Sequence, residues 1–373
     1  MLRPASEEEV AELLRAADAE GRKLVPRGGG TKLTWGRPAE GEPLSLRELD
    51  RLVALEPGDF VCVAQAGMRL ADLQAALAAD RGHRQRLMLD PPHGADATLG
   101  GIVATNASGP LRHRYGAPRD LVIGARLVLA DGTRAKTGGK VVKNVAGYDL
   151  ARLLCGSLGS LAVITELAFR LHPVPEDSRT VLLETRDAAQ AARFAAAVRG
   201  GGLTPTVLEI AWPDGRVVAR FDSTEQAAKE QAAAAAAHDP AAKVLTDSER
   251  RVLGPRIDGR PWTDAGPVVG LGVPLARVAD LLRLAGEHAS DLALRAGVGV
   301  GEARLKEDPD AVAAFVRGVG ALGGHVAPRR MPAELDGAAW PEQDPVARSL
   351  ALAVKRQLDP NDTLAAGRLT EAA

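Results

Sequence analysis

The sequence Pro-Arg-Gly-Gly-Gly-Thr-Lys occupies residues 26–32 and directly follows Lys23-Leu24-Val25, which we predict to be a short strand. Two further glycine-bearing segments lie at residues 96–120 and 143–166. Each glycine costs more conformational entropy on folding than alanine would, so three such loops in one domain need a physical explanation. One explanation is that glycines let successive amide N–H groups surround a phosphate. Each loop alone also fits an ordinary tight turn, but the three together predict a long, dianionic ligand.

The glycine pattern does not correspond to the common nucleotide-binding motifs. A Rossmann fingerprint requires G-x-G-x-x-G in a strand-to-helix turn, with an acidic residue about 20 positions later. No stretch of the sequence meets that description, and a Walker loop is absent too. The nearest stretch, Gly297-Val298-Gly299-Val300-Gly301, has the wrong spacing, and we predict a strand or turn with packing glycines there.

Local patterns predict the elements around the three loops. Ser6 and Glu9 form a capping box at the start of an amphipathic helix that ends near Gly21. Asp131-Gly132 is a turn signal between two strands of a β-hairpin. The remaining predictions are a turn or short helix at 44–56, an extended segment at 60–66, helices at 70–79 and 149–154, and a loop or broken helix at 91–116.

The amino-acid composition changes after His172-Pro173-Val174-Pro175, and we predict a domain boundary near residue 175. Beyond it the predicted helices are rich in alanine, at 187–198 and 225–238, and the strands between them are short. A last helix is predicted at 349–357.

Composition excludes several classes of protein. With 373 residues, 46% of them hydrophobic and 25% charged, the chain is long enough for one large or two to three ordinary globular domains. Lys plus Arg (47) nearly cancel Asp plus Glu (48), so we expect no nucleic-acid partner. Cys62 and Cys155 are the only cysteines, which rules out an iron–sulfur cluster or cysteine zinc site within this chain.

The sequence contains no apolar run of about 18 residues, so we predict no membrane span. The opening stretch MLRPASEEEV becomes acidic at once and lacks an apolar core. We therefore expect a cytoplasmic protein that associates with a membrane only through partner subunits.

Three segments carry a family resemblance: PRGGGTK at 26–32, DATLGGIVATNASGPLRHRYGAPRD at 96–120 and KNVAGYDLARLLCGSLGSLAVIT at 143–165. In order and spacing they resemble the flavin-binding segments of the vanillyl-alcohol-oxidase/PCMH flavoprotein superfamily. Within it, the chain is most similar to the FAD-binding subunits of bacterial glycolate oxidases. Supporting details are Trp35-Gly36, Gly324-His325 and the ending KRQLDPNDTLAAGR at 355–368.

The resemblance implies an α+β fold with FAD as its cofactor. It predicts a PCMH-type FAD-binding domain of two α/β subdomains at 1–174 and a smaller substrate-binding or cap-like α+β domain at 175–345. A C-terminal helix and tail at 346–373 would return to the FAD domain. His93 lies where some superfamily members attach flavin covalently, but one histidine in a Pro-Pro-His-Gly loop is weak evidence, and we predict noncovalent FAD.

The resemblance also implies site residues. Residues 27–32 would give amide N–H groups to the pyrophosphate, 98–101 and 106–109 would line the ribityl chain and flavin edge, and 156–164 would flank the diphosphate and adenosine. Arg114, Tyr115 and Arg119 lie in a loop that would touch flavin or phosphate, although a solvated role fits the two arginines equally well. The predicted cofactor-binding set is Pro26, Arg27, Gly28, Gly29, Gly30, Thr31, Lys32, Pro91, Thr98, Leu99, Gly100, Gly101, Asn106, Ser108, Gly109, Arg114, Tyr115, Gly156, Ser157, Gly159, Ile164 and Thr165.

The catalytic residues stay unassigned at this stage. Oxidation of a 2-hydroxy acid needs a base, a cation for the carboxylate and a flavin placed to take the hydride. Catalytic relatives place a histidine-rich, often metal-binding cluster in the second domain, whereas the matching stretch here, residues 295–301, contains no histidine. Spacing of the seven histidines assigns no metal site. His325, followed by Arg329 and Arg330, is the best candidate for anion binding, and a structural histidine is the alternative.

Three functions are therefore open. The first is the FAD-binding subunit of a glycolate oxidase, which would oxidise glycolate to glyoxylate beside a paralogous FAD-containing catalytic subunit and an iron–sulfur subunit. The second is a self-sufficient FAD-dependent dehydrogenase of a 2-hydroxy acid or sugar, and the third is a noncatalytic nucleotide-binding scaffold. Under the first function, a β-branched residue at Gly29 is predicted to abolish flavin retention.

Overall fold

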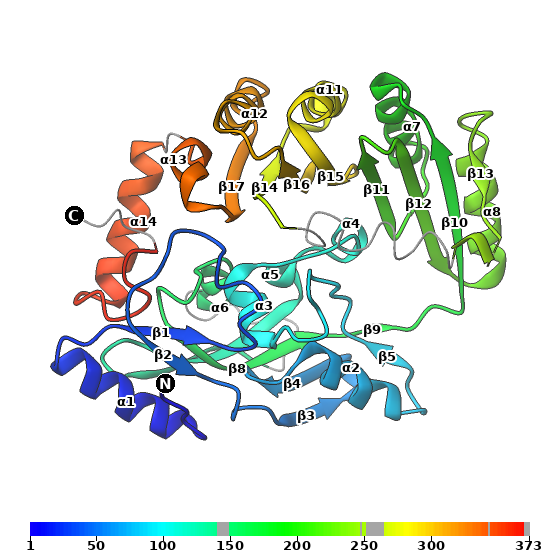
Figure 1. Cartoon of the computed structure of the whole chain (residues 1–373). Coiled ribbons are helices and arrows are strands. Elements are labelled where there is room, and N and C mark those ends of the chain that lie inside the picture. The colour runs from blue at the N-terminus through cyan, green and yellow to red at the C-terminus, as the bar shows by residue number, and fades with distance from the viewer. Residues whose placement is uncertain (140–148, 247, 251–264, 342–343, 369–373) are drawn as a thin grey trace. The chain divides into compact units, whose positions relative to one another are not determined.

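The computed structural model describes residues 1–139, 149–246, 248–250, 265–341 and 344–368 (Figure 1). Its elements divide into two compact units. The first comprises Met1–Ser108, Gly116–Val174 and Gln343–Ala373, and the second comprises Gly109–Tyr115 and Pro175–Glu342. Both units combine helices with sheets, which confirms the predicted α+β class.

The first unit is built on a five-stranded antiparallel sheet with strand order β3-β4-β8-β6-β7. Strand β1 pairs with β2 in parallel, and β5 pairs with β9 antiparallel. The strands are β1 Leu24–Arg27, β2 Glu42–Ser45, β3 Leu52–Glu56, β4 Val61–Gln65, β5 Gln85–Arg86, β6 Val122–Val128, β7 Arg134–Gly138, β8 Val163–Arg170 and β9 His172–Pro173. The helices are α1 Glu7–Ala19, α2 Leu70–Ala79, α3 Leu99–Thr105, α5 Pro118–Leu121, α6 Leu150–Leu154 and α14 Pro345–Leu358, with a 3₁₀ turn at Pro57–Asp59.

Helix α1 begins at its predicted cap, because Ser6 Oγ accepts a hydrogen bond from the Glu9 amide at 3.1 Å. Its first turn is anchored to the five-stranded sheet through Glu7. Arg126 of β6 donates two hydrogen bonds to the Glu7 carboxylate, at 2.9 and 2.8 Å, and the Thr165 hydroxyl donates a third at 2.8 Å. The Arg126 guanidinium holds the pKa of Glu7 below its usual value.

The predicted hairpin is confirmed, since β6 and β7 pair antiparallel and Gly132 adopts a φ of 81° in the turn between them. The prediction of a turn or short helix at 44–56 is right only for residues 46–49, where the Leu49 amide donates to the Leu46 carbonyl, because β2 and β3 occupy most of that stretch. Its leucines mimic helical spacing for another reason. Leu44 lies in parallel register with Pro26 of β1, and Leu46 and Leu49 pack into the core beneath α1.

The second unit contains one antiparallel eight-stranded sheet, with strand order β13-β10-β12-β11-β15-β16-β14-β17. Helices α7, α8, α11 and α12 cover one of its faces (Figure 1). The strands are β10 Asp177–Glu184, β11 Val207–Trp212, β12 Arg216–Ser223, β13 Lys243–Val244, β14 Val268–Gly272, β15 Ala289–Arg295, β16 Val300–Leu305 and β17 His325–Arg330. The helices are α4 Arg112–Tyr115, α7 Ala188–Gly200, α8 Glu225–Ala236, α11 Val278–His288, α12 Pro309–Ala321 and α13 Asp336–Ala339, with 3₁₀ turns at Leu275–Arg277 and Ala333–Leu335.

Strand periodicity separates the two faces of this sheet. Apolar residues such as Leu208, Leu294 and Ala303 point into the core beneath the helices. Their strand neighbours on the other face include the buried polar residues Glu209, Asp291, Arg295 and Glu302. The face opposite α7, α8, α11 and α12 is therefore polar over β11, β15 and β16, unlike the apolar face.

The glycine-rich stretch at 297–301 is a turn that leads into β16, as predicted. Gly299 has a φ of 71°, and a Cβ on Gly301 would lie 2.4 Å from the Ala293 carbonyl oxygen. A Cβ on Gly297 would lie 2.0 Å from the imidazole of His113 in α4. Each glycine is thus explained by packing within the second unit.

The segment that follows α14 runs beside β1. The Leu24 amide donates to the Thr363 carbonyl at 2.8 Å, and the Ala365 amide donates back to the Leu24 carbonyl at 2.8 Å. The C-terminal residues thereby extend the strand that leads into the first glycine loop. Of the helices that the structure describes, none has the length and apolar character needed to cross a membrane.

Candidate functional site

A pocket in the first unit forms where the three glycine-bearing segments meet. Its walls come from the loop after β1, the start of α3 and the turn before β8, with Arg368 closing one side. The predicted cofactor-binding residues that line it are Pro26, Arg27, Gly28, Gly29, Gly30, Thr31, Lys32, Thr98, Gly100, Gly101, Gly159 and Ile164. Segments more than 130 residues apart in the sequence are thus brought together, as the ligand hypothesis requires.

Contact between the first two loops requires Gly28 and Gly29. A Cβ on Gly28 would lie 1.9 Å from Thr98 Oγ1, and a Cβ on Gly29 would lie 2.0 Å from the Asp96 carbonyl oxygen. These two glycines thus make room for the backbone and side chain of the second loop. The sequence pattern by itself instead predicts room for a ligand. Packing of one loop on the other is what brings both into one pocket.

Backbone donors of the first loop are available to a ligand. The amides of Gly28, Gly29, Gly30 and Thr31 donate no hydrogen bond to any residue in the described part of the chain. Gly30 adopts a φ of 77°, a left-handed conformation that favours glycine. Consecutive free amides in such a turn are the donor arrangement that binds phosphate oxygens.

Two buried cations line the same pocket. Lys32 is 7% exposed and Arg368 is 9% exposed. Lys32 Nζ donates to the Thr31 hydroxyl at 3.1 Å and lies 5.9 Å from the centre of the Trp35 ring. Among the described residues neither cation has an ion-pair partner, and burial lowers the pKa of Lys32 to about 8. A buried, unneutralised pair of positive charges fits an anionic ligand.

The other predicted residues do not line this pocket. Leu99 is fully buried in the core, and the Thr165 hydroxyl is used by Glu7. Asn106 has a φ of 49° at the end of α3, and its side-chain oxygen accepts from the Arg119 amide at 3.3 Å. The remaining ones are Pro91, Ser108, Gly109, Arg114, Tyr115, Gly156 and Ser157, of which Gly109, Arg114 and Tyr115 cluster with the second unit.

Ser157 is buried, and its hydroxyl has no hydrogen-bond partner in the part of the chain that the structure describes. The first part of the third segment, KNVAGY at 143–148, lies outside the described residues. Cofactor contacts of the residues beyond the pocket therefore remain predictions.

Sequence reasoning missed Arg368 as a site residue. The ending KRQLDPNDTLAAGR served only as a family resemblance, because nothing local in it indicates where the arginine lies. In the structure Arg368 donates to the carbonyls of Leu33, at 2.9 Å, and Trp35. The Gly367-Arg368 pair at the end of this family-like stretch was the only available signal.

Comparison with known proteins identifies the type of site. Residues 1–138 match the protein family described as "FAD binding domain". The matched segment includes the first two glycine-bearing loops. Over 97% of this chain, the structure also superimposes on 74% of alkyldihydroxyacetonephosphate synthase, with a TM-score of 0.70 and 18% identity. The fold of the FAD-binding part is therefore of the PCMH type.

Relatives in sequence include an FAD-linked oxidoreductase, a glycolate oxidase subunit and a D-lactate dehydrogenase. An uncharacterized FAD-linked oxidoreductase of Mycobacterium tuberculosis is 37% identical over 56% of this chain and 45% of its own length. Glycolate oxidase subunit GlcE of Escherichia coli is 38% identical over 46% of this chain and 49% of its own length. D-lactate dehydrogenase of Archaeoglobus fulgidus is 38% identical over 48% of this chain and 39% of its own length. The matched part thus spans at most about half the length of these relatives.

FAD fits this pocket. Its diphosphate carries two negative charges, and the pocket offers two buried cations together with the free amides of the first loop. The unsatisfied Arg368 Nε is a further donor. These groups have the charge and the donors that a diphosphate requires.

We expect Lys32 to make FAD binding depend on pH. Because burial lowers the pKa of Lys32 to about 8, the apoprotein loses this positive charge as the pH rises through that value. Bound diphosphate favours the protonated form, so affinity is highest below pH 8. We expect the dissociation constant for FAD to rise about tenfold between pH 7 and pH 9.

Titration of apoprotein by quenching of FAD fluorescence measures this constant. The variant Lys32→Arg keeps its charge over the whole range, and its affinity should vary little with pH. A wild-type affinity that is constant from pH 7 to pH 9 would contradict the assignment of Lys32.

Proposed function

We propose that this chain is the FAD-binding subunit of a glycolate oxidase complex, which oxidises glycolate to glyoxylate. Its relatives in sequence support the class of substrate. They include glycolate oxidase subunits GlcE and GlcD and several D-lactate dehydrogenases, whose names specify 2-hydroxy acids. FAD, when bound, supplies the acceptor for a hydride.

Two arginines in the second unit, one buried and one partly buried, carry the proposal. On the polar face of the eight-stranded sheet, Arg295 is 4% exposed and is paired with the buried Glu302. Arg329 lies over β14, because a Cβ on Gly270 would come within 2.7 Å of its Nε. Burial lowers the pKa of the Arg329 guanidinium, and the Glu302 carboxylate opposes this effect. Guanidinium groups held in this way suit the carboxylate of a small hydroxy acid.

The small number of cysteines supports the subunit role. Cys62 and Cys155 are both free and lie in separate elements, so this chain does not supply the thiolate set of an iron–sulfur cluster. We propose that electrons leave through a partner iron–sulfur subunit. A paralogous FAD-containing subunit would complete the catalytic machinery that residues 295–301 lack.

The visible spectrum of the purified chain tests the proposal, recorded before and after anaerobic glycolate. Bound flavin that bleaches only after the partner subunits are added is the expected result. Flavin that bleaches in the isolated chain would establish the self-sufficient dehydrogenase instead. Flavin that glycolate and D-lactate fail to reduce, even in the complex, would leave the scaffold role.

Arg329→Met tests the carboxylate site separately from the cofactor. In the assembled complex we expect the apparent affinity for glycolate to fall on the order of 100-fold, because a charge-assisted bidentate contact is lost. The FAD content should stay the same, since the pocket lies in the first unit. Arg317→Met, an exposed arginine on α12, is the control and should match wild type. Unchanged glycolate affinity in Arg329→Met would remove the arginine set from the site.

A further inference from the structure

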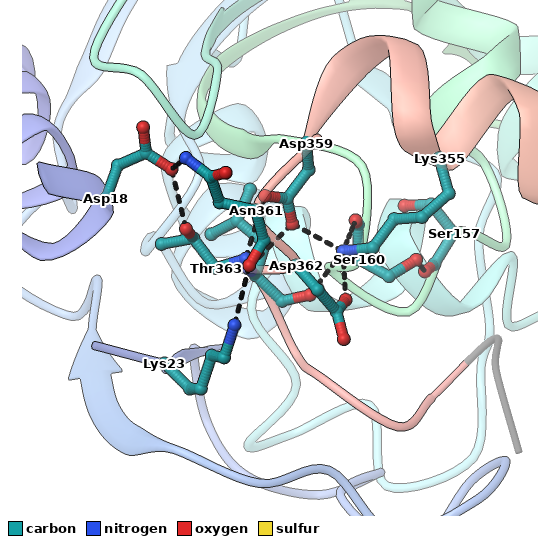
Figure 2. A network of polar contacts seen from close by, with 10 residues as sticks. Asp18, Lys23, Ser157, Ser160, Lys355, Asp359, Asn361, Asp362 and Thr363 are labelled. Atoms are coloured by element: carbon teal, nitrogen blue, oxygen red, sulfur yellow. Dashed lines mark hydrogen bonds and ion pairs between the residues drawn. The ribbon is translucent and has the colours of Figure 1, made fainter. Parts of the chain in front are cut away.

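A buried lysine organises the chain after α14 (Figure 2). The ammonium group of Lys355 donates to the carbonyl oxygens of Ser160 and Leu364, both at 2.9 Å. It also contacts the carboxylates of Asp359 and, at 2.9 Å, Asp362. Lys355 is 4% exposed and Asp359 is 1% exposed. The network joins α14 both to the C-terminal segment and to the turn before β8 that lines the pocket.

The same network shapes the turn that follows the helix. Asp359 accepts hydrogen bonds from the amides of Thr363 and Leu364, at 2.8 Å each. The Thr363 hydroxyl donates to Asp18 at 2.8 Å, and Lys23 Nζ donates to the Asn361 carbonyl at 2.6 Å (Figure 2). Polar contacts at both ends thus fix the direction in which the chain leaves this turn.

That direction leads to the cofactor pocket. Beyond Thr363 the chain follows β1, and the Glu40 amide donates to the Ala366 carbonyl at 2.9 Å. Arg368 then donates to the carbonyls of Leu33 and Trp35, in the turn that continues the first glycine loop. Carbonyl dipoles orient the guanidinium but do not neutralise it.

The charge of Arg368 calls for an anion. The side chain is 9% exposed and lines the pocket, and its Nε has no hydrogen-bond partner among the described residues. Burial of an unpaired charge is strongly unfavourable, so such a group is found where a ligand completes its surroundings. Lys32, at the end of the first glycine loop, is likewise a buried cation. Among the described residues its only hydrogen-bond acceptor is the Thr31 hydroxyl.

We propose that Arg368 and Lys32 together bind the diphosphate of FAD, and that Lys355 is the positioning residue that brings Arg368 to it. The C-terminal segment is then a working part of the FAD site. This inference concerns the cofactor alone and does not depend on the substrate, so it stands whether or not glycolate is oxidised.

Ligands with and without the diphosphate test the assignment. FAD, ADP and adenosine are titrated into apoprotein of wild type and of Arg368→Met, using flavin fluorescence for FAD and calorimetry for the other two. We expect Arg368→Met to weaken FAD and ADP roughly 10- to 100-fold, since a charge-assisted contact is lost. Adenosine affinity should be unchanged. Lys355→Met should show the same ADP-selective loss, because it acts through Arg368.

Control variants keep the test decisive. Arg47→Met removes an exposed arginine two residues after β2 and should bind all three ligands as wild type does. Arg368→Lys retains the charge and covers the case in which the methionine variant does not fold; it should lose less FAD affinity than Arg368→Met. Equal losses of affinity for ADP and adenosine would show that Arg368 only stabilises the structure of the pocket. No loss of affinity for either ligand would overturn the proposal.

Discussion

Gly29→Ala is expected to lower FAD affinity on the order of 100-fold, so that the protein is purified largely without flavin. The added Cβ would lie 2.0 Å from the Asp96 carbonyl oxygen and 3.1 Å from its carbon. Both atoms belong to the backbone of the second loop and have no rotamer with which to withdraw. The first loop must move away from the second, and its free amides then no longer point into the same pocket as Thr98.

Gly58→Ala is the matched control, because a Cβ at that position has no atom within 4 Å and Gly58 lies in a surface 3₁₀ turn of the same unit. It should retain the wild-type FAD content. The measurement is the ratio of flavin to protein absorbance after purification, followed by titration of the apoproteins. A Gly29→Ala protein with full flavin would refute the loop contact, and with it the prediction for β-branched residues.

Lys355→Met is expected to cost roughly 3–5 kcal/mol in the free energy of unfolding. The substitution leaves the Asp359 carboxylate buried without its cation and leaves the Ser160 and Leu364 carbonyls without a donor. The side chains of Lys355 and Asp359 are 5% and 0% exposed, so water does not replace the lost partner. Urea unfolding of the apoprotein measures the change without a contribution from bound FAD.

Lys229→Met is the matched control, because Lys229 also pairs with a carboxylate four residues away, Glu225, but on the surface of α8. Solvent screens that pair, and we expect no measurable change in unfolding. The double variant Lys355→Met with Asp359→Asn removes the stranded charge and should recover part of the lost stability. A single variant as stable as wild type would show that the network is not an energetic part of the fold.

Local signals in the sequence predicted many of the elements that surround the site. Ser6 caps α1 and Asp131-Gly132 turns the hairpin, because each feature depends on residues within a few positions of one another. The prediction for residues 44–56 missed β2 and β3 because their structure depends on residues far away in the sequence. The spacing of their leucines reflects a core shared with α1 and β1, and a tertiary contact of that kind can imitate helical periodicity in a segment that is not a helix.

The sequence by itself determined the location of the glycine loops, since runs of glycine record backbone requirements at the position where they occur. Its family resemblance indicated FAD as the cofactor. Only the tertiary structure decided which neighbours those glycines admit and which cations share their pocket. Arg368 and Leu33 are 335 residues apart, and Lys355 and Ser160 are 195 apart. Contacts at such separations depend on how α14 and β1 are packed, and no local pattern encodes that packing.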